Sequence, residues 1–181
     1  MFVNDLLIAY FQAKIDSIYK ERFAVYNDFF QNEVAVSKGF EKLTNTAIQF
    51  PLYRLMEVYP YFHKGVSNLE EFPEVSDEFY NYRHKISLNE EDLVSFYPYQ
   101  NYVVSYLYNI SSQLKETDSA KNDLTVNILN AINEHITAED FKNTLLKRII
   151  VRDLLKSESA CQINEEALNL FLTNCTNKEY V

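Results

Sequence analysis

Apolar residues recur at intervals of three, four and seven along most of the chain, which is the spacing of amphipathic helices. The first such stretch predicts one long helix from Asn4 to about Glu33. Its apolar residues share one face of that helix: Phe11, Ile15, Ile18, Val25 and Phe29.

Arg22 interrupts this apolar face. Arginine often packs its aliphatic stem on apolar neighbours while its charged head reaches water or a carboxylate, and we expect that arrangement here. The alternative is a buried arginine that binds a ligand.

The same spacing predicts a series of shorter helices in the rest of the chain. Pro51 is expected to end or kink the second helix, Pro60 to stop it or start another, and Pro98 to kink or split the helix that contains it. Gly39 is expected in a turn or cap before the second helix. Asn89 and Asn164 are expected to cap the helices that follow them. The further helices are predicted at Phe40 to about His63, Ser76 to about Lys85, Asn89 towards Lys115, Asp118 or Ser119 through Ile136, Ala138 to about Ser157, and Glu165–Thr173.

No segment alternates apolar and polar residues for long enough to predict a strand. Only two glycines and four prolines occur in 181 residues, which leaves little of the turn chemistry that sheets require. The sequence therefore predicts an all-α fold, an irregular array of about six to eight helices with short loops. We expect residues 1–181 to form a single α-helical domain, a fragment of a longer protein because the tail Asn177–Val181 has no stop signal.

The formal net charge of −9 argues against partners that are polyanions. Nucleic-acid binding depends on lysine and arginine to neutralise phosphates, and an anionic membrane surface attracts the same residues. No stretch has the roughly 20 apolar residues of a membrane span, and Met1–Tyr10 does not have the pattern of a secretory signal. Cys161 and Cys175 flank a predicted helix that would hold them too far apart for a disulfide, so both are predicted to be free thiols.

The sequence predicts no catalytic, cofactor-binding or metal-binding residues. Its three histidines, His63, His84 and His135, lack partners at metal-ligand spacing. Glu134-His135 beside Glu139-Asp140 offers metal-binding groups, but we interpret it as a solvated helix junction. Three basic residues at steps of four form a ridge that either lies on a solvated face or docks an acidic partner: Arg148, Arg152 and Lys156.

One region resembles the helical segment that precedes the thioredoxin domain in TlpA-like thiol–disulfide oxidoreductases of the Gram-negative cell envelope. The resemblance rests on four short motifs of caps and core aromatics, in the same order. They are Glu57-Val58-Tyr59-Pro60-Tyr61-Phe62, Ser76-Asp77-Glu78-Phe79, Ile86-Ser87-Leu88-Asn89-Glu90-Glu91-Asp92-Leu93, and Tyr97 to Tyr102 with Tyr106.

The resemblance implies a non-catalytic accessory domain in the periplasm or cell envelope, which positions a downstream thioredoxin-like domain or contacts its protein substrate. Family members carry a W-C-x-x-C active site, whereas this chain has no tryptophan and no such cysteine pair, so no catalytic residue is carried over. The alternative is a free-standing α-helical module that binds a protein or peptide in an aromatic-lined groove. Segments Lys64–Pro73 and Tyr97–Tyr108 are the candidates for that groove.

Overall fold

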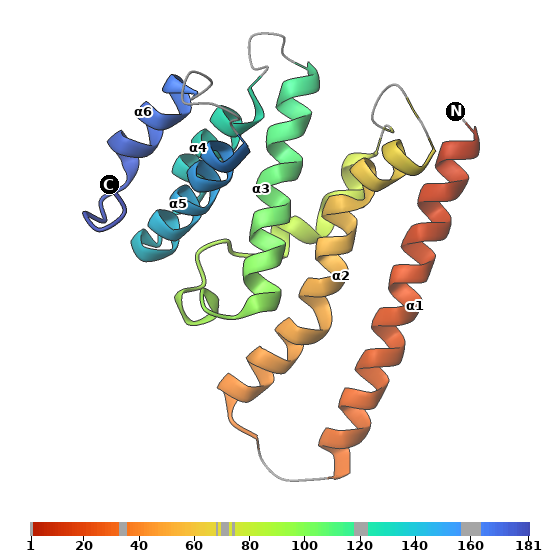
Figure 1. Cartoon of the computed structure of the whole chain (residues 1–181). Helices are drawn as coiled ribbons and strands as arrows, with labels where there is room; N and C mark the ends of the chain where they lie inside the picture. The colour runs from red at the N-terminus through yellow and green to blue at the C-terminus, as the bar shows by residue number, and fades with distance from the viewer. Residues whose placement is uncertain are drawn as a thin grey trace. The chain divides into compact units, whose positions relative to one another are not determined.

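A computed structural model describes residues 2–32, 36–67, 69, 73, 75–117, 123–156 and 164–181. These residues form α-helices and 3-10 helices, with no strand among them, which confirms the predicted all-α fold (Figure 1). No helix within the described residues is both long and apolar enough to cross a membrane. The elements are α1 (Phe2–Asn32), α2 (Lys38–Val66), η1 (Asp77–Lys85), η2 (Glu91–Leu93), α3 (Tyr97–Thr117), α4 (Leu124–His135), α5 (Glu139–Lys156) and α6 (Glu165–Asn174).

Helix α2 is longer than its prolines suggested. It begins after Ser37, whose hydroxyl oxygen accepts the backbone N–H of Phe40 at 3.2 Å, and it continues through both Pro51 and Pro60. Gly39 therefore lies in the first helical turn rather than in a turn before it. Neither Pro51 nor Pro60 ends the helix, because packing of the flanking turns outweighs the hydrogen bonds that each proline removes. The alternative of a kink at Pro51 stays a prediction.

The predicted helix from Asn89 to Lys115 begins later than expected. Only a 3-10 turn follows Asn89, and α3 begins at Tyr97 with Pro98 in its first turn. A proline there removes no helical hydrogen bond, so it starts the helix instead of kinking it. Asn89 bonds to distant backbone instead: its Oδ1 accepts the N–H of Thr137 at 2.7 Å, and its Nδ2 donates to the carbonyl of His135 at 3.0 Å.

Two of the later helices start at side-chain caps. Asn164 Oδ1 accepts the N–H of Ala167 at 3.0 Å at the start of α6, as the sequence predicted. Asp123 Oδ1 accepts the N–H of Val126 at 2.9 Å at the start of α4. The predicted start of that helix, at Asp118 or Ser119, lies outside the described residues.

The contacts divide the chain into two compact units. The first contains residues 1–86 and 96–102, and the second contains residues 87–95 and 103–181. Helix α3 contributes its first turns to the first unit and its remainder to the second. Each unit has its own buried apolar residues, and each is described by itself below.

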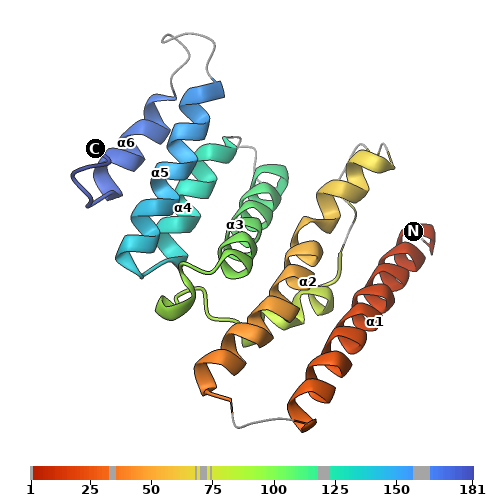
Figure 2. The same cartoon turned by 60° about the horizontal axis from the view of Figure 1, so that its bottom comes forward.

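The first unit is built on an antiparallel hairpin of α1 and α2, which lie side by side in Figures 1 and 2. Phe79 of η1 is almost fully buried against this pair. The buried core of the hairpin consists of Ile15, Leu52, Met56, Tyr59 and Phe79.

The second unit packs α4 against both α5 and α6 (Figure 2). Asn143, buried on α5, fixes the segment after α6. Its Oδ1 accepts the N–H of Thr176 and its Nδ2 donates to the hydroxyl of Thr176, each at 2.9 Å. The core contains Leu107, Ile128, Leu129, Ile132, Ile136, Leu146 and Phe171.

Candidate functional site

The apolar face of α1 divides into two halves with different surroundings. In the first half Phe11 stacks on Tyr59 with ring centroids 4.3 Å apart, and the ring of Phe79 lies 6.3 Å from that of Phe11. Ile15 is buried in the same cluster. Here α1, α2 and η1 together enclose the apolar side chains, as the spacing predicted.

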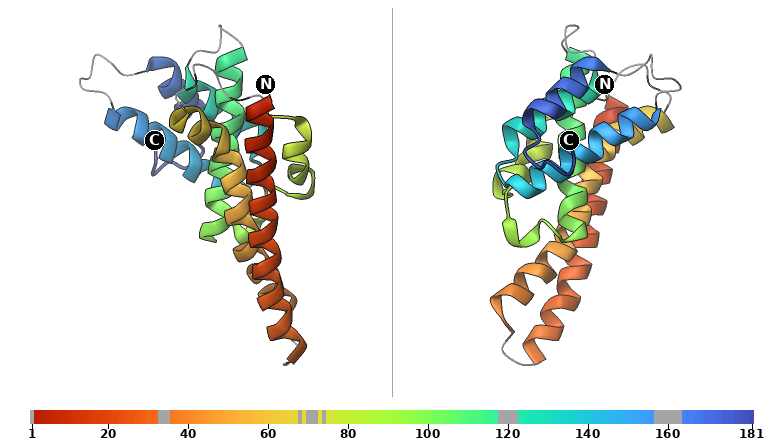
Figure 3. Two further views of the ribbon diagram at one scale, coloured as in Figure 1. Left: turned by 90° about the vertical axis from the view of Figure 1, so that its right-hand side faces the viewer. Right: turned by 60° about the vertical axis from the view of Figure 1, so that its left-hand side comes forward.

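In the second half the same face is open to solvent. Val25 is 72% exposed and Phe29 is 60% exposed, although both were predicted to share the buried face with Ile15. Figure 3 shows the physical reason: the loop end of the hairpin extends past η1. Without a third element packed on the two helices, this part of the apolar face stays exposed to solvent.

The uncovered half forms an apolar groove between α1 and α2, here called the hairpin groove. It has a volume of about 440 Å³. Phe40, which contributes from the first turn of α2, is 49% exposed. The lining residues are Arg22, Val25, Tyr26, Phe29 and Phe30 of α1 and Phe40, Thr44 and Ile48 of α2.

A row of aromatic rings forms the floor between the two helices. Along α1, Tyr26 lies 5.3 Å from Phe23 and 4.3 Å from Phe30, centroid to centroid. Phe30 then reaches across to Phe40 of α2 at 6.0 Å. Tilted rings at these distances attract one another, so these contacts stabilise the floor of the groove.

Arg22 is exposed and lines one end of the hairpin groove. The hypothesis of a buried ligand-binding arginine was therefore wrong. Its position agrees with the first expectation, an arginine whose stem packs on apolar neighbours while its head reaches water.

The first unit also contains a buried charged cluster. Glu57, fully buried on α2, accepts two hydrogen bonds from Arg83 of η1, at 2.9 Å from Nε and 2.5 Å from Nη2. The hydroxyl of Tyr82 donates to the same carboxylate at 2.7 Å. Burial, the Glu57 charge and this hydrogen bond together raise the pKa of Tyr82 above its usual range.

This cluster binds η1 to α2. Arg83 also lies over the ring of Tyr80, 3.8 Å from its centroid. Partial burial acts to lower the pKa of Arg83, but the hydrogen bond and the charge of Glu57 hold this pKa above its usual value. Because every member of the cluster is paired within the unit, its geometry is that of a structural ion pair rather than a site that receives a ligand.

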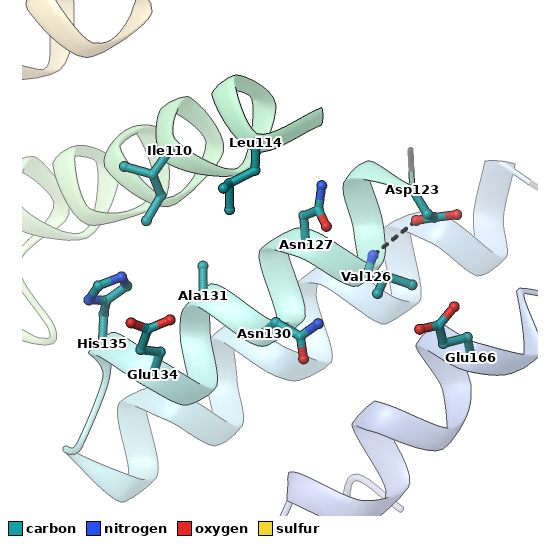
Figure 4. A pocket seen from close by; sticks show the side chains of 10 residues that line it. All are labelled: Ile110, Leu114, Asp123, Val126, Asn127, Asn130, Ala131, Glu134, His135 and Glu166. Carbon is teal, nitrogen blue, oxygen red and sulfur yellow. Dashed lines mark hydrogen bonds between the residues drawn. The ribbon is translucent and has the colours of Figure 1, made fainter. Parts of the chain in front are cut away.

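A second hollow, of about 280 Å³, lies in the second unit between α3, α4 and the start of α6 (Figure 4). One wall is apolar, with Ile110 and Leu114 of α3 facing Ala131. The other carries acidic and amide groups. Its polar residues are Asp123, Asn127, Asn130, Glu134, His135 and Glu166.

Three of the polar residues that line this second hollow interact with other parts of the second unit. Asp123 already caps α4 and also accepts Nδ2 of Asn164 at 2.6 Å. Asn127 donates to the carbonyl of Ser111 at 3.3 Å, and the His135 ring packs edge-on against Tyr106. These polar groups are thus engaged in holding the helices.

The acidic turn around His135 does not assemble into a metal site in the described part of the chain. Glu139 accepts a hydrogen bond from the hydroxyl of Thr176 at 2.5 Å, and Asp140 is exposed in the first turn of α5. No group of three histidine, cysteine, aspartate or glutamate residues in the described ranges could hold a metal ion.

The predicted basic ridge on α5 is not uniformly solvated. Arg148 is exposed, but Arg152 is half-buried with its guanidinium 4.6 Å from the ring centroid of Tyr108. Burial lowers the pKa of Arg152, and the nearby charge of Asp153 opposes that shift. Arg152 therefore packs between helices, so only part of the ridge is available to an acidic partner.

Of the two segments proposed as a peptide groove, Tyr97–Tyr108 is mostly packed into the protein. Tyr99 and Tyr102 are fully buried, and only Tyr97 of that segment is strongly exposed. Much of Lys64–Pro73 lies outside the described residues. The signals for the hairpin groove were the charged Arg22 within the apolar face and the length of α1.

One of the two cysteines, Cys175, lies in the described residues. Cys175 is a buried free thiol whose Sγ lies 3.8 Å from the carbonyl oxygen of Asn177. Cys161 lies outside the described residues.

No protein-family model, curated protein or solved structure matches this chain.

Proposed function

We propose that this chain is a helical protein-interaction module whose binding surface is the hairpin groove. The observation that carries the proposal is the exposure of Val25 and Phe29 on the same face that buries Ile15. Exposed contiguous apolar surface of this kind is typical of interaction sites.

The shape of the groove supports a helix as the partner. Arg22 and Phe30 are eight helical steps apart on α1, roughly 12 Å or two helical turns. The volume of about 440 Å³ is about three times the roughly 150 Å³ that accommodates one benzene ring. It therefore has room for about three side chains, which matches anchors at positions i, i+4 and i+7 of an amphipathic helix.

A neutral model peptide tests this proposal. We would use a fluorescein-labelled helix of eighteen residues with leucine on one face and glutamine on the other, and measure binding by anisotropy. Val25→Asp places a charge in the groove and is expected to weaken binding by about tenfold or more, because the carboxylate loses water on contact. Leu6→Asp is the matched control, since Leu6 is also exposed on α1 but lies outside the groove.

Equal affinity of wild type, Val25→Asp and Leu6→Asp would contradict the proposal, as would the absence of any binding. Both substitutions are at exposed positions, so a circular-dichroism melt that matches wild type would confirm that folding is unaffected.

A second proposal concerns the larger protein in which the module would act: the accessory domain of a cell-envelope, thioredoxin-like thiol–disulfide oxidoreductase. Its support is the resemblance, whose motifs contribute Tyr59, Phe79, Leu93, Tyr99 and Tyr102 to the buried residues. Reading the natural gene past codon 181 tests it. A W-C-x-x-C within roughly the next hundred codons would support it, and a nearby stop codon would remove it.

A further inference from the structure

Acidic residues border the hairpin groove on both helices. On α1, Glu21 and Asp28 lie four residues before and three residues after Val25, so all three share one edge of the helix. On α2, Glu41 lies seven residues before Ile48 and three before Thr44, both of which line the groove. We call these three residues the acidic rim.

The charge of Glu41 also acts on the groove floor. Desolvation and then the charge of Glu41 raise the pKa of Tyr26, which lies in the groove floor. The charge of Glu41 is therefore close enough to act on a lining residue. Ser17 donates to Glu21 Oε1 at 3.0 Å, a hydrogen bond along α1 that holds this carboxylate at the helix surface.

The basic residues of the same stretch lie mainly elsewhere. Lys38 and Lys42 line a separate hollow on α2, and Glu41 lines the same hollow together with Asn45, Thr46 and Gln49. Among the described residues, Arg22 is the single basic residue that lines the groove, and it does so at the end away from the interhelical loop. A partner therefore meets the carboxylates of Glu21 and Asp28 along the α1 flank, Glu41 beside two lysines on the α2 flank, and one guanidinium at one end.

We infer that the partner in the hairpin groove is a basic amphipathic helix, with leucine-like anchors on one face and lysine or arginine on its flanks. This inference rests on the proposed function. Apolar anchors would fill the groove between Val25, Phe29 and Phe40 while flanking cations face Glu21, Asp28 and Glu41.

The net charge of the chain favours the same choice. At −9 it attracts a basic partner over a distance and repels an acidic one. A second copy of this chain would bring its own acidic rim against the first and would double the like charge. We therefore favour a basic helix over self-association as the occupant.

Three helical peptides that differ only in their polar face test the inference. Each has leucine anchors, with lysine, glutamine or glutamate elsewhere, and binding is measured by anisotropy at low and high sodium chloride. The lysine peptide is expected to bind about tenfold more tightly than the glutamine peptide at low salt, and the difference is expected to fall below about threefold at 0.5 M salt. The glutamate peptide is expected to bind most weakly.

A double substitution locates the effect at the rim. Glu21→Gln with Glu41→Gln is expected to reduce the lysine-over-glutamine preference by about threefold or more at low salt. Glu165→Gln with Glu179→Gln is the matched control, because it removes the same charge from exposed positions in the other unit. This control is expected to retain most of the preference.

The outcomes separate the two proposals. Binding of the glutamine peptide without any advantage for lysine would overturn the basic-helix inference and leave the interaction module standing. Binding of none of the three peptides would overturn both. A dimer of the chain in sedimentation that Val25→Asp converts to monomer would assign the groove to a second copy and overturn the inference.

Discussion

Glu57 connects α2 to η1 through its buried carboxylate. It is fully buried, and its carboxylate oxygens accept hydrogen bonds from Arg83 and Tyr82, which lie more than twenty residues further along the chain. A buried ion pair contributes little net stability over apolar packing, but the loss of one partner leaves a buried charge without compensation.

Glu57→Gln is therefore expected to lower the free energy of unfolding by about 3 kcal/mol, because Arg83 keeps its charge and loses the carboxylate. Urea denaturation followed by circular dichroism measures the change. Glu78→Gln, at an exposed position of η1, is the control and is expected to change stability by less than about 0.5 kcal/mol. A Glu57→Gln protein as stable as the control would contradict this account of the cluster.

Tyr82 gives the first unit a dependence on alkaline pH. Its pKa is raised by burial and by Glu57 in the folded chain, so the folded state holds this proton when the unfolded state, with its ordinary pKa of 10.0, releases it. The stabilising effect is complete below pH 10 and is lost as pH rises above it, because the unfolded state then binds fewer protons than the folded state.

Tyr82→Phe removes this contribution. The stability of wild type is expected to fall more steeply between pH 10 and 11 than that of the variant, by up to about 1.4 kcal/mol per pH unit. Urea denaturation at pH 8, 10 and 11 measures both slopes. Some slope will remain in the variant, since burial also raises the pKa of Tyr53 and Tyr59. Identical slopes would show that Tyr82 does not ionise on unfolding in this range.

At the level of elements, helix α1 uses one apolar face for two purposes. Its first half packs into the core with Tyr59 and Phe79, and its second half lines the hairpin groove. Spacing alone cannot separate these halves, because both have the same period. The halves differ because η1 packs over the first half and not over the second. Such a tertiary contact cannot be read from the spacing of apolar residues.

Two phenylalanines on this face make a matched pair. Phe11→Ala is expected to cost about 3 kcal/mol of unfolding free energy because it leaves a cavity against Tyr59 and Phe79. Phe29→Ala is expected to cost less than about 1 kcal/mol because the ring is mostly exposed. Equal losses, measured by urea denaturation, would show that the far half of the face is covered after all.

Asn89 connects the η2 segment to the junction between α4 and α5. Asn89→Ala removes its bonds to His135, Thr137 and Ala138 and is expected to cost about 2 kcal/mol, since three backbone groups, two of them part-buried, lose their partner. Asn169→Ala, at an exposed position of α6, is the control. Thermal unfolding of the two variants gives the comparison, and a difference within error would contradict the role assigned to Asn89.

The sequence predicted the helical elements well because their apolar spacing is regular and several caps are local. Asn164 illustrates this, since its cap involves a residue three positions away. Asn89 illustrates the limit: it was predicted to cap the next helix, but its partners lie more than forty residues away. Local patterns carry no information about such pairings, nor about the buried bonds between Glu57 and η1.

For the candidate site, too, the sequence predicted which residues share a helical face but not which elements pack on that face. Val25, Phe29 and Arg22 were recognised as one helical face, which was correct. The exposure of Val25 and Phe29 was not predicted, because it depends on what packs above the hairpin. A groove was predicted at Tyr97–Tyr108 because this segment is rich in tyrosine, yet Tyr99 and Tyr102 are core residues.

For the molecule as a whole, the chain is acidic, but its two units have different surfaces. The first has a large apolar hollow at the loop end of its hairpin, and the second has a mixed polar hollow whose amide and acidic groups hold helices together. The net charge of −9 acts on any partner of either unit. These features support a binding role that is concentrated on the first unit.

A titration of isotopically labelled protein with the glutamine-faced amphipathic peptide, followed by backbone amide NMR, tests the central claim most directly. We predict shifts that concentrate in residues 22–30 and 38–48, with the second unit little changed. Shifts that concentrate around Ile110 and His135, or no shifts at millimolar peptide, would contradict the assignment of the hairpin groove as the binding surface.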